Sequence, residues 1–253
     1  MAEGLVDEAL EQGRAYGLRP LGIGLGVIGL VEVETGVLLH APALGWSGVP
    51  IRAWLTQRFR LPVHVESEAN AAAIGYSRYG EVAGSRHLIY LSIGAGMAGG
   101  LMLDGQIYRG SGGMAGHIGH IKISGSGELC TCGKKGCLVS EIGERALLRQ
   151  VQALVHVPNP AGVVPRTSLV DASGQRLCLE ALCSAVRQDE DVRCIVERAA
   201  RTLGMEIANL INIFNPERIV LGGTLFPLFP VMLPAIRQCV RDMVLPQMRA
   251  NVA

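Results

Sequence analysis

Residues 116–143 read G-H-I-G-H-I-K-I-S-G-S-G-E-L-C-T-C-G-K-K-G-C-L-V-S-E-I-G, and they hold three of the seven cysteines of the chain. Cys130, Cys132 and Cys137 form a C-x-C-x4-C cluster. His120 precedes the first of them by ten residues. Three thiolates and one imidazole make a complete tetrahedral ligand set for a structural zinc ion. The spacing therefore predicts a zinc loop.

Neither a set of free thiols nor a disulfide framework fits these cysteines as well. The first alternative is a set of three unrelated free thiols. Thiols this close together in a reducing compartment, however, are typically metal ligands or redox pairs. A disulfide framework would leave one of the seven cysteines without a partner. Glycines at 133 and 136 favour the metal loop, because folding three sulfurs around one ion needs tight turns, partly at positive φ. The remaining cysteines are dispersed in apolar, helix-like sequence: Cys178, Cys183, Cys194 and Cys239.

The chain is nearly neutral in charge and rich in apolar residues. Its 253 residues carry a net charge of +1, and 18% of them are charged while 49% are hydrophobic. That balance argues against nucleic-acid binding by this chain alone, which normally needs a basic surface. No apolar run is long enough to span a bilayer. The N-terminus M-A-E-G-L-V-D-E-A-L lacks the basic segment of a secretory signal, which together with unpaired cysteines predicts a cytoplasmic protein.

Strands alternate with helices along the chain, which predicts the α/β class. The run at 21–33 is β-like and dense in glycine, which usually means that a neighbouring backbone or a ligand approaches closely. In the first part of the chain we further expect a loop over 46–50, a strand over 61–66 and helices over 4–17, 51–59 and 70–79.

A second β block begins at His87 and has a hairpin turn at Asp104-Gly105. The break near 80–84 is the expected domain boundary, although the chain can cross back. It separates residues 1–82 from residues 83–253, which include the zinc loop. After that loop we expect helices over 140–156, 177–186, 191–214 and 233–243, a Pro-rich connection over 157–165 and a buried strand within 215–224.

Five stretches of the chain carry a resemblance to a known family. The zinc loop matches the pattern G-H-x9-C-x-C-G-x-x-G-C from Gly119 to Cys137. The other four are L-G-I-G-L-G-V-I-G-L-V-E (21–32), V-H-V-E-S-E-A-N-A-A-A-I-G (63–75), L-I-Y-L-S-I-G-A-G-M-A-G-G-L-M-L-D-G-Q-I-Y-R-G (88–110) and I-N-I-F-N-P-E-R-I-V-L-G-G-T (211–224). Together they resemble the ROK family (repressors, open reading frames and kinases). Within it, the chain is most similar to the sugar-responsive regulators of the N-acetylglucosamine-repressor type.

The resemblance implies an actin-like ATPase fold, of the ribonuclease H-like type. The D-x-G-G-T turn that opens the family's kinases has no counterpart before Leu21, and neither does the winged helix-turn-helix of the repressors. We therefore expect a first domain that is truncated at its N-terminus, with residues 1–82 as its remnant. DNA would be reached only through a domain absent from this chain. The remaining sheet edge would need cover from a partner or from upstream residues.

The resemblance also implies a sugar site that contains Ser67, Glu68, His117 and His120. The kinases carry Asn-Asp where this chain has Ser67-Glu68, and that Asp acts as general base toward a sugar hydroxyl. A Glu is still a base, but its extra methylene moves the carboxylate by about 1–1.5 Å, which costs on the order of 10²-fold in a positioned proton transfer. At two positions where the kinases hold sugar hydroxyls with Glu, this chain has His117 and Val139.

A nucleotide site is implied at two glycine turns. Its candidate residues are Gly94, Gly96, Gly222 and Gly223. The phosphate-loop Thr of the kinases is replaced by Ala95, and glycines join strands without any ligand in many proteins. We interpret these turns as structural rather than phosphate-binding.

These departures favour a sugar-sensing effector and dimerisation domain of a ROK-type transcriptional regulator, without kinase activity. A carbohydrate or sugar phosphate would bind to it, zinc would hold the loop beside the sugar, and a homodimer would couple domain closure to DNA. The alternative is an ATP-dependent sugar kinase, of the hexokinase or N-acetylhexosamine kinase type, with Glu68 as general base and with ATP and magnesium as cofactors. A third hypothesis is a degenerate piece with a structural zinc alone.

Overall fold

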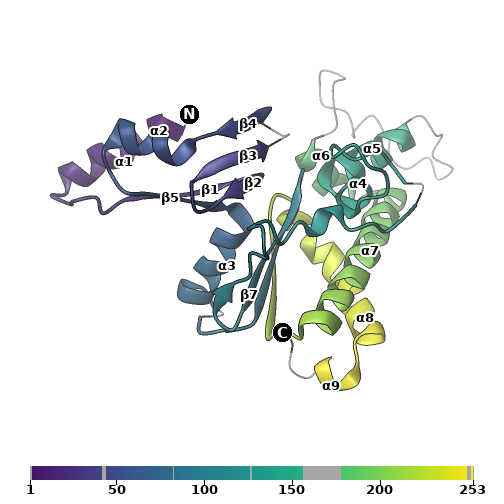
Figure 1. Ribbon diagram of the computed structural model, residues 1–253. Helices are drawn as coiled ribbons and strands as arrows, with labels where there is room; N and C mark the ends of the chain where they lie inside the picture. Colours follow the sequence, from purple (N-terminus) through teal and green to yellow (C-terminus); the bar gives the residue numbers. More distant parts are fainter. Residues whose placement is uncertain are drawn as a thin grey trace. The chain divides into compact units, whose positions relative to one another are not determined.

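The computed structural model describes residues 2–41, 44–81, 83–125, 127–155, 178–249 and 252. The chain divides into two compact units (Figure 1). Unit 1 comprises Met1–Ala71 and Gly110–Met114, and unit 2 comprises Ala72–Arg109 and Ala115–Ala253. The chain thus returns briefly to unit 1. The expected domain boundary between residues 82 and 83 stays a prediction, and the expected Pro-rich connection over 157–165 lies outside the described residues.

Unit 1 contains one parallel pair of strands and one antiparallel meander. The pair joins β1 to β5 with a register that runs from Ile23↔Val63 to Val27↔Ser67. The meander has the order β2-β3-β4. The elements of unit 1 are α1 (Ala2–Ala15), β1 (Ile23–Val27), β2 (Leu30–Glu32), β3 (Val37–Ala41), β4 (Trp46–Val49), α2 (Ile51–Phe59) and β5 (Val63–Ser67).

The glycine-dense run at 21–33 forms two strands rather than one, and Gly29 separates them. Its φ is +124°, and a Cβ there would lie 2.5 Å from the carbonyl oxygen of His40 and 2.9 Å from the Cβ of Ala41. The backbone of β3 therefore approaches closely, as the glycines predict. Unit 1 has its own small core, formed by Val31, Leu38, Ala41, Ile51, Leu55 and Val65.

The expectation of a loop over 46–50 is wrong for Trp46–Val49, which form strand β4. This strand pairs antiparallel with β3 through Leu38↔Val49 and Ala41↔Trp46. Its four residues include Gly48 at a φ of +65°, and three of them are exposed. Such a segment carries almost no alternating apolar signal, so its strand character comes from the hydrogen bonds that β3 offers.

Unit 2 is built on a four-stranded sheet of order β8-β7-β6-β9. β6 and β9 are parallel, while β7 is antiparallel to β6 and to β8. The predicted hairpin turn at Asp104-Gly105 joins β7 to β8, with both residues at positive φ. The strands are β6 (Leu88–Ile93), β7 (Met97–Leu103), β8 (Gln106–Ile107) and β9 (Arg218–Gly222).

Helices and short 3-10 turns complete unit 2, and α3 links the two units in sequence. No helix among the described residues is both long and apolar enough to cross a membrane. The helical elements are α3 (Glu68–Tyr79), η1 (Ile118–His120), α4 (Leu138–Ile142), α5 (Glu144–Val155), α6 (Leu179–Ala185), α7 (Glu190–Phe214), η3 (Phe226–Leu228), α8 (Phe229–Met243) and α9 (Pro246–Arg249).

Two helix predictions need correction. The single helix expected over 140–156 is two helices, because Gly143 is extended (ψ 167°) and closes α4 before α5 begins. A Cβ at Gly143 would lie 3.1 Å from the carbonyl oxygen of Gly94, so the break follows from close packing against the end of β6. Helix α8 begins at Phe229, four residues earlier than expected. Pro230 lies in its first turn, where a missing N–H costs nothing.

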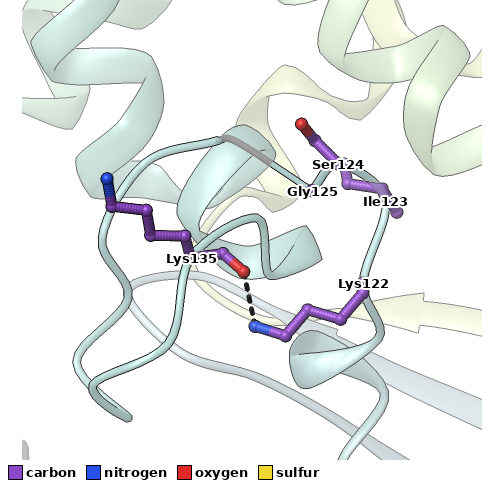
Figure 2. Close-up of a pocket in the computed structure, with 5 residues that line it drawn as sticks. All are labelled: Lys122, Ile123, Ser124, Gly125 and Lys135. Atoms are coloured by element: carbon purple, nitrogen blue, oxygen red, sulfur yellow. Dashed lines mark hydrogen bonds between the residues drawn. The ribbon is translucent and has the colours of Figure 1, made fainter.

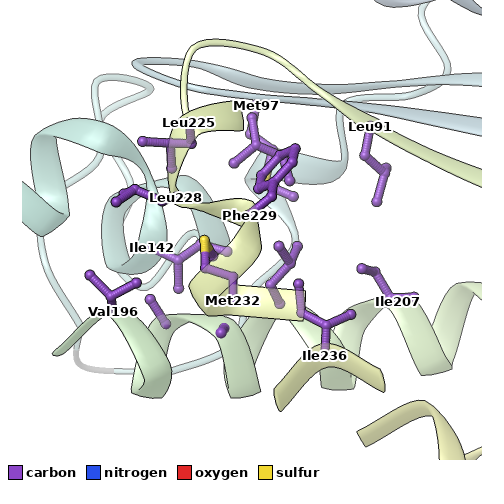
Figure 3. Close-up of a cluster of buried hydrophobic side chains, with 14 of the residues drawn as sticks. Leu91, Met97, Ile142, Val196, Ile207, Leu225, Leu228, Phe229, Met232 and Ile236 are labelled. Atoms are coloured by element: carbon purple, nitrogen blue, oxygen red, sulfur yellow. The ribbon is translucent and has the colours of Figure 1, made fainter. Parts of the chain in front are cut away.

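The core of unit 2 lies between the sheet and the helices α4, α5, α7 and α8. Helix α7 is 25 residues long and buries one apolar stripe along most of its length. Figure 3 shows α8 side chains meeting α7, with Leu91 of β6 and Met97 of β7 beside them. The labelled members of this cluster are Leu91, Met97, Ile142, Val196, Ile207, Leu225, Leu228, Phe229, Met232 and Ile236.

Candidate metal centre and glycine turns

The four predicted metal ligands lie together in unit 2. One ligand atom from each of His120, Cys130, Cys132 and Cys137 lies within 4.8 Å of the other three. The Cys132 and Cys137 sulfurs are 3.6 Å apart, and the Cys130 sulfur is 3.7 Å from Nδ1 of His120. A tetrahedral zinc ion with bonds of about 2.0–2.3 Å holds its ligand atoms about 3.3–3.8 Å apart. The donor set and its spacing therefore fit zinc.

Backbone pairing across the loop brings the ligands together. Cys137 forms an antiparallel β-bridge with Lys122, which lies two residues after His120. The N–H of Cys130 donates to the carbonyl of Lys134 at 2.8 Å, and the N–H of Gly133 donates back to the carbonyl of Cys130 at 2.9 Å. These bonds close the turn between the first two sulfurs and the third.

The glycines of the loop occupy positions that other residues would disturb. Gly133 and Gly136 have φ values of +81° and +69°. A Cβ at Gly136 would overlap the carbonyl oxygen of Ser124. Gly116, at a φ of +96°, lies against β7 so closely that a Cβ would overlap the carbonyl oxygen of Gly99. The left-handed backbone favours glycine at all three positions, and the close approach adds a steric requirement at Gly116 and Gly136.

Burial and charge differ among the four ligands. Cys130 and Cys137 are buried, whereas Cys132 and His120 are exposed. Burial raises the pKa of the Cys137 thiol, and a hydrogen bond from Lys122 opposes that rise only in part. Desolvation alone would raise the pKa of the Cys132 thiol. Hydrogen bonds from the Lys134 backbone and from the other two thiols outweigh it, so the pKa is lowered overall. Desolvation, followed by the charge of Lys122, lowers the pKa of His120, which favours the neutral imidazole that binds metals.

His117 and Val139 are the two positions that the family resemblance matches to sugar-binding carboxylates of the kinases, and this match stays a prediction. His117 is exposed, and its ring centroid is 6.3 Å from that of His120. Desolvation, followed by the neighbouring His120, lowers the pKa of His117, so this side chain is uncharged near neutral pH. Val139 lies on α4 and packs against the core of unit 2. No charge is therefore available at either of these two positions.

Ser67 and Glu68 lie in unit 1, where β5 ends and α3 begins. Ser67 Oγ accepts a hydrogen bond from the N–H of Asn70 at 3.3 Å, which is an N-terminal cap. Glu66 is only 3% exposed, and its Oε1 accepts from the N–H of Ser67 at 3.0 Å and from Nδ2 of Asn70 at 3.1 Å. This network fixes the turn that presents the exposed Glu68. Glu66 and Asn70 are not predicted from the sequence, although a Ser directly before a helical pattern is a capping signal.

The predicted glycine turns lie at the carboxyl ends of β6 and β9 and contact each other. A Cβ at Gly94 would lie 2.5 Å from the hydroxyl of Thr224. Gly223 has a φ of +97°, and a Cβ there would overlap the backbone of Ile93. A Cβ at Gly222 would overlap the ring hydroxyl of Tyr90. Close packing explains these three glycines without a ligand, while Gly96 is exposed and faces open space.

Glu144 joins the two glycine turns, and no motif in the sequence points to it. It begins α5, and its N–H donates to the carbonyl of Gly94 at 3.0 Å. Its Oε2 accepts a hydrogen bond from the hydroxyl of Thr224 at 2.6 Å. A carboxylate is favourable at the positive end of a helix dipole. A negative side chain of the protein therefore lies at the two glycine turns, where the family resemblance implies a nucleotide site.

The known proteins that are similar in sequence to this chain include both repressors and kinases. The chain is 36% identical over 222 residues to a xylose repressor of Caldicellulosiruptor bescii, covering 88% of this chain and 55% of that protein. It is 34% identical over 228 residues to a glucokinase of Halalkalibacterium halodurans, covering 90% of this chain and 68% of that protein. The chain spans between about half and three quarters of the length of the curated relatives it matches.

The solved structures similar to this chain also include both a regulator and a kinase. A ROK family transcriptional regulator described as a homologue of the E. coli MLC protein superposes with a TM-score of 0.82 at 28% identity, covering 99% of this chain and 62% of that chain. A ROK family glucokinase from Streptomyces griseus, in complex with glucose and AMPPNP, superposes with a TM-score of 0.78 at 30% identity, covering 95% and 79%. The sequence model of the ROK family matches residues 2–253. The chain therefore belongs to the ROK family and has the mixed α/β, actin-like ATPase fold that the sequence predicts.

Proposed function

We propose that this chain is the sugar-sensing effector part of a ROK-type transcriptional regulator and that it has no kinase activity. The repressors among its relatives support a regulatory role, and the glucokinases among them support a monosaccharide as the ligand. A carbohydrate that binds one of two conformations more tightly shifts the population toward it. In a homodimer, that shift changes the spacing of DNA-reading parts that lie outside this chain.

The observation that carries this proposal is the position of Glu144. Its carboxylate accepts from Thr224 at 2.6 Å, and its backbone N–H is bound to Gly94, so it lies between the two turns that would have to hold ATP phosphates. A triphosphate brought there would meet a like charge at close range, which disfavours binding. Gly94 packs against Thr224 at the same point, and its N–H donates to the carbonyl of Gly96 at 2.9 Å.

We propose sugar contacts for each unit separately. In unit 1, Glu68 would accept hydrogen bonds from sugar hydroxyls and Ser67 would donate or accept them. In unit 2, the neutral imidazole of His117 would offer one donor and one acceptor, as suits a neutral polyol. The catalytic Asp of the kinases is absent, and the longer side chain of Glu68 places its carboxylate differently.

Zinc has a structural role in this proposal. His120, Cys130, Cys132 and Cys137 would fill all four positions of a tetrahedral ion, and a closed site of this kind leaves no position for a substrate. When bound, the ion supplies a crosslink that fixes the loop. The same short segment carries His117, so the metal and the sugar contact would be mechanically linked.

A thermal-shift screen with enzymatic readout tests this function. The ligands are D-xylose, D-glucose, N-acetylglucosamine and their phosphates, each with and without ATP and magnesium, with ADP release measured in parallel. At a concentration near 100 times its Kd, a sugar should stabilise the chain by about 2.7 kcal/mol, which corresponds to a rise of several degrees in Tm. ATP should add nothing, and no ADP should form.

Matched variants identify the site. His117→Ala and Glu68→Gln should abolish the sugar-dependent shift, whereas His64→Ala, at another exposed histidine, should keep it. Sugar-dependent ADP release that disappears in Glu68→Gln would instead establish the kinase, with Glu68 as general base. If no ligand shifts the Tm and no ADP forms, the result would favour a degenerate chain with a structural metal alone.

A further inference from the structure

The side chain of Lys122 reaches into the metal centre. Its Nζ lies 2.9 Å from the sulfur of Cys137 and also donates to the carbonyl oxygen of Lys135 at 2.6 Å. Figure 2 shows this ammonium turned toward Lys135, at the edge of an open pocket that it lines together with Ile123 and Ser124. The sulfur of Cys137 and the carbonyl oxygen of Lys135 therefore hold the ammonium of Lys122 in place. It is not a freely moving surface lysine.

Backbone geometry places the two side chains together. Lys122 and Cys137 are partners in an isolated antiparallel bridge, so their side chains leave neighbouring positions on the two segments. Cross-strand neighbours of this kind have Cβ atoms about 4.5–5.5 Å apart, within easy reach of a lysine. The contact therefore follows from the loop's own backbone pairing.

The charge of the proposed metal centre calls for a cation. Three thiolates, one neutral imidazole and Zn²⁺ sum to a net charge of −1, and the sulfurs of Cys130 and Cys137 belong to residues only 5% and 0% exposed. Cys132 and His120 are exposed, so the cost falls on the buried side of the centre, where a charge on a sulfur is costly unless it is paired and hydrogen-bonded. The ammonium of Lys122 brings the sum to zero and provides the hydrogen bond.

We propose that Lys122 is an outer-sphere cation of the metal centre, which neutralises the ligand set and shields the Cys137 sulfur so that zinc is retained and the thiolate is protected from electrophiles. This inference rests on the proposed zinc site and goes beyond its four ligands. An N–H···S hydrogen bond draws electron density from the sulfur, which makes the sulfur less nucleophilic. Outer-sphere partners of this type commonly change metal affinity by about 10–100-fold.

Alkylation of the zinc-bound thiolate offers a direct measurement. With iodoacetamide, the sulfur attacks the methylene carbon, an S–C bond forms, the C–I bond breaks and iodide leaves. The resulting thioether binds zinc poorly, so zinc is released and a chromogenic chelator reports it. Zinc release from Lys122→Met should be at least about tenfold faster than from the wild type. Without iodoacetamide, release to excess chelator should also be faster.

Three further variants separate the contributions. Lys134→Met removes the same charge from the same loop, and Lys134 engages the cysteines through its backbone rather than its ammonium, so zinc release should match the wild type. Lys122→Arg keeps the charge with a different shape, and its rate should be intermediate. Lys122→Gln keeps an N–H donor without charge, and it carries the test if Lys122→Met fails to fold.

The outcomes distinguish this inference from the metal site on which it rests. A wild-type chain that binds no zinc overturns the metal centre itself. Zinc bound near one per chain, with equal release rates for Lys122→Met, Lys122→Gln and Lys134→Met, overturns the role of Lys122 and leaves the metal centre in place. Faster release in Lys122→Met and Lys122→Gln but not in Lys134→Met supports it.

Discussion

Two glycines of the zinc loop share a backbone conformation but differ in their surroundings. Gly133 and Gly136 both lie at positive φ. A Cβ at Gly133 would meet nothing within 4 Å, whereas one at Gly136 would overlap the carbonyl of Ser124. The pair therefore separates the cost of a left-handed backbone from the cost of a steric clash.

Replacing each glycine by alanine should give different results. Gly133→Ala should lose about 1–2 kcal/mol from the left-handed conformation alone and should still bind about one zinc per chain. Gly136→Ala carries the same cost plus the clash with Ser124, so it should bind clearly less zinc. Elemental analysis together with thermal unfolding measures both effects. Equal zinc content in the two variants would show that the loop relaxes around the added methyl group.

Among the helices, α7 and α8 meet at a glycine. A Cβ at Gly204 would lie 2.8 Å from the Cβ of Cys239 and 3.0 Å from the Cα of Ile236, so the two helices approach backbone to side chain. Gly75 on α3 is also helical, but a Cβ there would meet nothing within 4 Å. These two positions share one intrinsic helix preference and differ in packing.

The two Gly→Ala variants should shift stability in opposite directions. Gly75→Ala should stabilise the chain by about 0.5–1 kcal/mol, because alanine restricts the unfolded backbone and favours helix. Gly204→Ala gains the same preference but must push α8 away, and overpacking of a core typically costs about 1–3 kcal/mol. Urea unfolding followed by circular dichroism gives both values. Stabilisation by Gly204→Ala would mean that α8 moves at little cost.

Sequence patterns predict the elements of this chain unevenly. The long apolar stripe of α7 and the hairpin turn at Asp104-Gly105 are recognisable because each signal is local and strong. The strand Trp46–Val49 is not, since its hydrogen bonds come from β3. The break at Gly143 is equally hidden, because it depends on contact with the end of β6 and not on neighbours in the chain.

At the scale of the molecule, the two units have separate hydrophobic cores. The core of unit 1 runs from Val31 to Val65, and that of unit 2 begins at Ile89. Both tryptophans of the chain, Trp46 and Trp54, lie in unit 1, so tryptophan fluorescence reports on that unit. The zinc loop lies in unit 2.

Removing the metal should therefore affect one unit and spare the other. After chelation, or in Cys132→Ser, amides of residues 116–137 and of α4 should lose protection from hydrogen exchange, because a structural zinc contributes on the order of 10 kcal/mol to local folding. Tryptophan emission should stay unchanged. Cys194→Ser, at an exposed cysteine on α7, is the control and should behave as wild type. A shifted tryptophan spectrum after chelation would show that the cores are coupled.

The family, the fold class and the four metal-ligand candidates could be predicted from the residues alone, because each depends on short spacings and on glycines whose backbone conformation is local. The surroundings of those residues became known only from the folded chain. Folding brought Lys122 to the sulfur of Cys137 and Glu144 to the hydroxyl of Thr224, 80 residues away. Such contacts depend on which strands and loops pair. No periodicity in the chain encodes that pairing, because it is set by packing the whole core at once.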